Sequence, residues 1–167
     1  MKIFKYLFIV LIIPVKLFAQ DPNVVKQQAN VMATATIKGD YPTLIAHTYP
    51  KLVNMMGGKE KAITLVSQAM AQMKSQGITV EKAVVGAPAK FYKAGSEIHC
   101  LVPENVTMAM PKGHASGSSN MLGISADGGK TWSFVDLNKA TIDKIPQLFP
   151  NFNKDLKIPE PTFTMSK

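Results

Sequence analysis

The chain has 167 residues, of which 46% are hydrophobic and 18% charged, and its formal net charge is +8. These proportions are typical of a globular domain and exclude a repeat array or a disordered tail. All 19 basic residues are Lys. Because Arg makes most of the bidentate contacts with phosphate and guanine, we do not expect a nucleic-acid partner.

Residues 1–19 have the layout of a secretory signal peptide, with Lys residues before an apolar run over 7–15. That run is much shorter than the roughly 20 residues that span a bilayer. We predict cleavage between Ala19 and Gln20 and no stable membrane anchor afterwards. The sequence thus predicts a secreted or periplasmic protein in which residues 20–167 form a single domain.

The first half of the predicted domain has helical signals. Asp21 followed by Pro22 is a favourable helix start, and Gly39 is a favourable stop. Asp40 and Tyr49 each stand close before a Pro and open further short segments. The predicted helices cover residues 22–38, 43–48, 49–58 and 59–76.

After Gly77 the spacing of apolar residues changes from a helical period toward a period of two, which indicates strands. The predicted strands are 79–85, 90–93, 97–102, 106–110 and 119–125, with a loop over 111–118. We expect Cys100 to be a small buried residue, since it alternates with Ile98 and Val102.

A hairpin over 125–136, a short helix over 138–145 and a Pro-rich tail complete the chain. Helices followed by strands predict an α+β fold, with N-terminal helices packed on a curved antiparallel sheet. The short C-terminal helix and the Pro-rich tail would follow this sheet.

The segment SADGGKTW, residues 125–132, resembles the Asp-box of sialidases and other β-propeller proteins. The resemblance implies a hairpin in which the Asp and the Gly-containing turn order the loop and the aromatic residue packs on the sheet. It does not imply sialidase activity, because a propeller needs about four or more blades. The residues of this predicted structural turn are Ser125, Asp127, Gly129, Thr131 and Trp132.

The order of helices and strands is similar to that of the nuclear-transport-factor-two-like superfamily of cone-shaped α+β domains. The resemblance implies helices leaning over a curved sheet around a pocket. Members of that superfamily range from isomerases and dehydratases to domains that bind without catalysis. The Pro-rich tail departs from the final strand of many members.

A pocket of this kind could use His47 or Asp40 as acid or base, and Tyr41 or Tyr92 as hydrogen-bond donor. Each has a structural alternative: Asp40 is a good helix cap, and His47 can pack or cap. Three aromatic residues could contact a ligand: Tyr92, His99 and Trp132. His99 could instead face solvent, since it lies on the opposite face of its strand from Cys100.

Met108, Met110 and His114 are the residues most suited to a soft metal such as Cu(I). The alternation of the two Met residues is also typical of a strand that faces a core, which is the interpretation we favour. We predict no cofactor.

The sequence favours non-catalytic binding of a hydrophobic small molecule or of a protein partner. An isomerase or dehydratase that uses His47 or Asp40 with Tyr41 and Tyr92 is the alternative. Copper binding by Met108, Met110 and His114 ranks below both.

Overall fold

The structure, a computed structural model, describes residues 20–166. Its first helix, α1, covers Pro22–Lys38, as predicted. The Asp21 side chain accepts a hydrogen bond from the Asn23 N–H at 2.8 Å, which caps the first turn. Gly39 ends the helix in the left-handed conformation with φ 70°, where glycine has no steric penalty.

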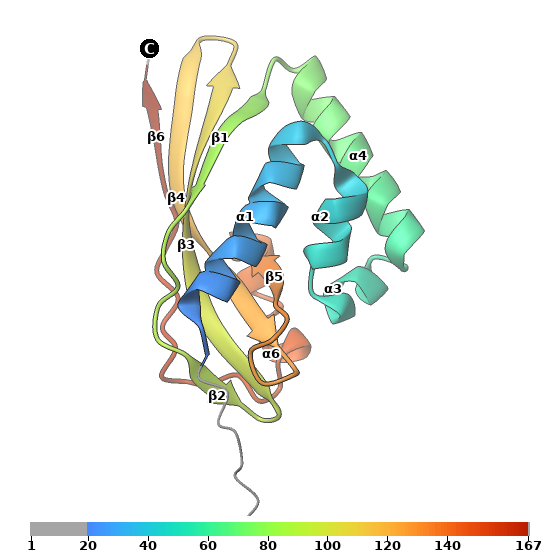
Figure 1. Cartoon of the computed structure of the whole chain (residues 1–167). Helices are drawn as coiled ribbons and strands as arrows, with labels where there is room; N and C mark the ends of the chain where they lie inside the picture. Colours follow the sequence, from blue (N-terminus) through green and yellow to red (C-terminus); the bar gives the residue numbers. More distant parts are fainter. Residues whose placement is uncertain (1–19, 167) are drawn as a thin grey trace, which may run out of the picture.

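Three further helices follow: α2 (Tyr41–His47), α3 (Pro50–Met55) and α4 (Lys59–Ser75). They pack on one another through Ile45, Val53 and Ala62. Figure 1 shows α1 between the sheet and this group, with α4 on the far side. The helices are therefore stacked in layers over one face of the sheet.

Within the described residues, a six-stranded antiparallel sheet curls around α1 (Figure 1). Its strands are β1 (Thr79–Val85), β2 (Tyr92–Ala94), β3 (Glu97–Met110), β4 (Gly113–Ser125), β5 (Ser133–Asp136) and β6 (Thr162–Ser166). The order is β1-β3-β4-β5, with β2 beside β3 and β6 beside β4. The predicted α+β class, with helices on a curved antiparallel sheet, is confirmed.

The β3–β4 hairpin corrects the prediction of a loop over 111–118. Its register runs without interruption from the pair Met110–Gly113 to the pair Ile98–Ser125. The turn therefore needs little more than residues 111 and 112. Residues 113–118 have weak strand propensity, but 114–118 lie between β3 and β6, so their backbone groups pair on both sides.

β3 is also one strand where we predicted two, although it contains Pro103. The Pro103 carbonyl accepts a hydrogen bond from the Gly86 N–H at 2.8 Å, just beyond the end of β1 at Val85. The nitrogen and the carbonyl of a strand residue point to the same neighbouring strand. Pro103 has no N–H group, but β1 has already ended on that side. No hydrogen bond between the two strands is therefore lost.

The C-terminal segment differs from the prediction in two ways. The expected helix over 138–145 is two short helices, α5 (Lys139–Ile142) and α6 (Ile145–Leu148), with Pro146 in the first turn of α6. The Pro-rich tail also ends in a strand, β6, which pairs with β4. Buried Leu148, Phe149 and Leu156 pack on the outer face of the sheet and form a second core there.

Alternation along β3 separates the two cores. Cys100 and Val102 face α1 on the inner side, whereas Leu101 faces the C-terminal segment on the outer side. Cys100 is fully buried, as predicted, and burial raises the pKa of its thiol to about 12. It is a packing residue with no reactive thiolate.

The predicted signal peptide, residues 1–19, lies outside the described residues, as does Ala19 of the predicted cleavage site. None of the helices in residues 20–166 is long and apolar enough to cross a membrane.

Candidate functional site

A cavity of about 390 Å³ lies between the helices and the concave face of the sheet. Its helical wall consists of Met32, Ala33, Thr36, Leu44, Ile45, Thr48, Leu52, Met56 and Val66. The strands contribute Val80, Ala83, Glu104, Val106, Ser119, Met121, Phe134, Val135 and Asp136, and the rim contains Asn138 and Thr141. Most of this lining is apolar, and the volume falls in the range of small-molecule sites, about 300–1,000 Å³.

The connection between α2 and α3 is anchored to the sheet beside this cavity. Thr48 forms an isolated parallel bridge with Phe134, and the Tyr49 N–H donates to the Phe134 carbonyl at 3.0 Å. The Thr48 hydroxyl also donates to the Leu44 carbonyl at 2.9 Å. These bonds hold the helical wall at a set distance from β5.

Two carboxyl groups line the cavity. Alternate residues of a strand share one face, so Glu104 faces inward with Val102 and Val106. By the same rule, Asp136 follows buried Phe134 onto the inner face of β5. Among the described residues that line the cavity, none is Lys, Arg or His.

The surroundings shift the titration of both carboxyl groups. Burial raises the pKa of Glu104 to about 7, and the nearby charge of Asp136 raises it further. Asp136 is exposed at the end of β5, but the protein atoms packed around its carboxyl group still raise its pKa by desolvation. The Asn138 amide, which donates to Asp136 Oδ2 at 3.2 Å, acts in the opposite direction. At neutral pH the pair can therefore hold a proton, accept hydrogen bonds, bind a cation, or exchange a proton with a bound molecule.

Sequence reasoning missed this pair, although a signal for it exists. The alternation of Ile98, Cys100 and Val102 continues to Glu104, but the prediction ended the strand before Pro103. The alternation of Trp132 and Phe134 likewise continues to Asp136. An acidic residue at an inward position of a strand is the observation that could have identified each group.

The predicted catalytic residues do not line this cavity. His47 Nδ1 donates to the Thr43 carbonyl of its own helix at 3.0 Å. Asp40 caps α2 by accepting from the Thr43 N–H at 3.2 Å, and hydrogen bonds from Thr43 lower the pKa of Asp40. Tyr41 is half-buried beside Gly39. The structure does not bring these groups together with Tyr92.

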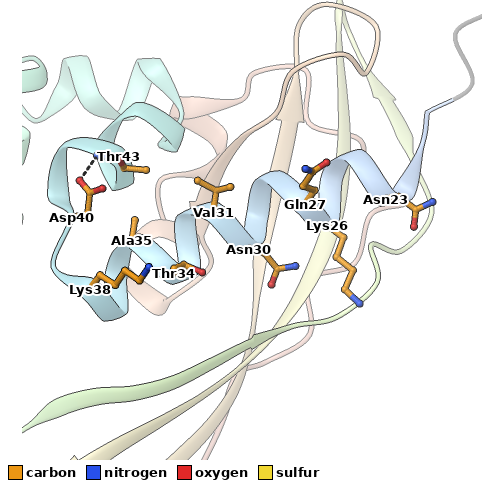
Figure 2. A pocket seen from close by; sticks show the side chains of 10 residues that line it. All are labelled: Asn23, Lys26, Gln27, Asn30, Val31, Thr34, Ala35, Lys38, Asp40 and Thr43. Carbon is orange, nitrogen blue, oxygen red and sulfur yellow. Dashed lines mark hydrogen bonds between the residues drawn. The ribbon is translucent and has the colours of Figure 1, made fainter.

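Asp40 and Thr43 instead lie at one end of an open hollow of about 610 Å³ along the outward face of α1. Figure 2 shows its side chains spread along the helix rather than directed at a common point. All of its described lining residues come from α1 and the start of α2, and most of them have polar side chains. We therefore interpret this hollow as a solvated helix face.

His99, a predicted ligand contact, faces away from Cys100 but is buried rather than exposed to solvent. The rings of Phe149 and Phe152 cover it, with centroids at 5.1 and 5.8 Å. Its Nε2 lies 3.1 Å from Glu97 Oε2, and the Tyr49 hydroxyl donates to Glu97 Oε1 at 2.9 Å. Burial lowers the pKa of His99, and the network links α3, β3 and the C-terminal segment.

The other two predicted ligand contacts also lie away from the cavity. Tyr92 pairs with His99 across β2 and β3, and the Lys90 ammonium lies 5.3 Å from the Tyr92 ring centroid. Trp132 is buried against Phe91, with ring centroids 5.7 Å apart. Both aromatic rings have structural partners.

The three predicted copper ligands do not share a face. His114 lies opposite Ala109 in the β3–β4 register, so it is on the other face from Met108 and Met110. Its Nδ1 is 3.0 Å from Glu81 Oε2 on that face. Within residues 20–166 there is also no group of three or more His, Cys, Asp or Glu that could hold a metal ion.

The Asp-box-like segment forms a tight turn between β4 and β5. The Asp127 carboxylate accepts from the Ser125 hydroxyl at 2.8 Å and from the Thr131 N–H and hydroxyl at 3.0 and 2.7 Å. The Ser125 hydroxyl accepts from the Gly129 N–H at 2.9 Å, and the Trp132 indole donates to the Gly129 carbonyl at 3.0 Å. These bonds order the hairpin, and none of residues 125–132 lines the cavity.

We expect Asp127→Ala to lower the free energy of unfolding by about 1–2 kcal/mol at pH 7, because several donors lose their acceptor. The bonds from Thr131 lower the pKa of Asp127 to about 2 from 3.8. Its contribution is therefore complete above pH 3.8 and is lost as the pH falls toward 2. Urea unfolding at pH 7 and pH 2.5 measures this, with exposed Asp155→Ala as the control. An equal loss at both pH values would contradict it.

No protein-family model, no curated protein and no solved structure matches this chain. The resemblance to the cone-shaped superfamily therefore stays a prediction, and the function proposed below is based on the inner cavity.

Proposed function

We propose that this protein binds a small, mainly apolar molecule in its inner cavity without chemical turnover. The observation that supports this is the cavity itself: about 390 Å³ between α1–α4 and the curled sheet, with a mainly apolar lining. The predicted export of the chain would place this binding outside the cytoplasm.

The size of the cavity favours a bound molecule over a packing defect. Asp136 and Asn138 of its lining are exposed, so the cavity is accessible from solvent and is not a void left by poor packing. Its volume lies at the low end of the range of small-molecule sites, which indicates a small ligand.

The anchoring of the walls also supports binding. The β-bridge between Thr48 and Phe134 and the hydrogen bond from the Tyr49 N–H to the Phe134 carbonyl attach the α2–α3 connection to β5 in the free protein. A site whose walls are already in place loses little conformational entropy when a ligand enters. The ligand's apolar surface can then contribute to affinity at about 25 cal/mol per Å² buried, less the cost of association.

The test is titration with the neutral fluorescent probe N-phenyl-1-naphthylamine, whose emission rises in an apolar site. Ala33→Leu on α1 and Ala83→Leu on β1 would fill the cavity from opposite walls, and we expect each to weaken binding at least about tenfold. Ala71 is exposed on α4, so Ala71→Leu is the matched control and should leave binding unchanged. Circular dichroism checks that each variant is folded.

Two outcomes would overturn the proposal. One is the absence of any emission change with the wild-type protein. The other is binding by the folded Ala33→Leu and Ala83→Leu variants as tight as that of the wild type.

A further inference from the structure

We infer that the ligand of the inner cavity carries a basic amine, whose ammonium group lies between Glu104 and Asp136; this inference rests on the proposed function. The apolar remainder of the ligand would then occupy the part of the cavity next to the helices.

The polar lining of the strands and rim gathers around these two carboxyl groups. In the β3–β4 register Ser119 lies directly opposite Glu104, and in the β4–β5 register Met121 lies opposite Asp136. Both acidic residues thus flank one short stretch of β4. Asn138 follows Asp136 at the rim and donates to its carboxylate at 3.2 Å. The cavity therefore has a polar, acidic end and a mainly apolar wall.

The charge at this end is unbalanced. No Lys, Arg or His belongs to the described lining of the cavity, so no basic side chain there offsets the two carboxyl groups. Glu104 pairs with Val85 on β1 and Ser119 on β4, neither of which titrates. The helical wall opposite also consists of residues that do not titrate. Asp136 is thus the titratable lining group that faces Glu104, and their charges repel.

An ammonium ion is the complement of such a pair. Its three N–H groups can donate to both carboxylates, and its charge removes the mutual repulsion between half-buried Glu104 and exposed Asp136. A carboxylate or phosphate ligand would meet repulsion here. A neutral alcohol could form one or two hydrogen bonds, but it would leave the repulsion in place.

Binding of the amine should release a proton. In the free protein the raised pKa of Glu104, about 7, leaves part of its population protonated at neutral pH. When the ammonium ion enters, the Glu104 carboxyl gives its proton to solvent and its carboxylate pairs with the cation. Amine affinity should therefore increase as the pH rises from about 6 to 8.

The experiment compares 2-phenylethylamine with the neutral near-isostere 2-phenylethanol, each displacing N-phenyl-1-naphthylamine from the protein at pH 7.5. We expect the amine to bind at least about tenfold more tightly than the alcohol. Calorimetry in phosphate and HEPES buffers, which differ in ionisation enthalpy, should show proton release with the amine and none with the alcohol.

Glu104→Gln removes one of the two acidic groups, and the double variant Glu104→Gln, Asp136→Asn removes both, while the amides keep the shape of the site. We expect both to reduce the preference for the amine and the double variant to abolish it, while the alcohol binds as before. Glu160 is exposed and is not one of the lining residues, so Glu160→Gln is the matched control.

Equal affinity for amine and alcohol in the wild type would overturn the inference and leave the proposed function standing. An amine preference that survives in the double variant would overturn it as well. A lack of binding by N-phenyl-1-naphthylamine and both competitors would overturn the proposed function and the inference together.

Discussion

Replacing Phe149 with alanine should lower the free energy of unfolding by about 3–5 kcal/mol, the usual cost of removing a buried aromatic ring. Phe149 is 3% exposed and lies in the outer core with Leu122 and Leu148. Its ring also contacts Tyr49, with centroids 4.8 Å apart, and covers His99. The loss would show that the C-terminal segment is part of the core.

Urea unfolding at pH 7.5 measures this effect. Phe163 on β6 is 55% exposed, so Phe163→Ala is a control with the same substitution in the same part of the chain. We expect it to change the free energy of unfolding by less than about 0.5 kcal/mol. Similar effects of the two substitutions would contradict the outer core described above.

Glu104→Gln should raise the free energy of unfolding by about 1–2 kcal/mol at pH 8, because the ionised Glu104 is poorly solvated beside Asp136. The pKa of Glu104 is raised from 4.5 to about 7 in the folded protein. Between these pH values the folded chain holds a proton that the unfolded chain has lost, so wild-type stability falls as the pH rises from 4.5 to 7. The amide does not titrate and avoids this fall.

Thermal or urea unfolding at pH 4.5, 6 and 8 tests this. The gain of Glu104→Gln over the wild type should be near its minimum at pH 4.5 and reach its full value above pH 7. Exposed Glu160→Gln should show no such trend. A gain that is independent of pH, or a loss at pH 8, would show that Glu104 is well solvated. The predicted result would mean that the free protein retains a group that lowers its stability, as is common for binding sites.

Much of the helical half could be predicted because its signals are local. Asp21 and Gly39 bound α1 as expected, and the Asp40 cap starts α2. Strand continuity was harder, because it depends on neighbours distant in sequence. Pro103 stays within β3 because β1 ends beside it, and residues 113–118 form a strand because β6 arrives from the end of the chain.

The candidate site shows the same division. The sequence by itself determined which side chains share a face, because alternation along a strand is a property of the local backbone. Cys100 and Glu104 share one face of β3, and Phe134 and Asp136 share one face of β5, for this reason. The tertiary structure alone decided which side chains from different elements lie together. Strand register and the curl of the sheet brought Glu104 and Asp136 to one cavity, and the C-terminal segment buried His99. Pairing and burial depend on contacts between residues far apart in the chain, which no local pattern encodes.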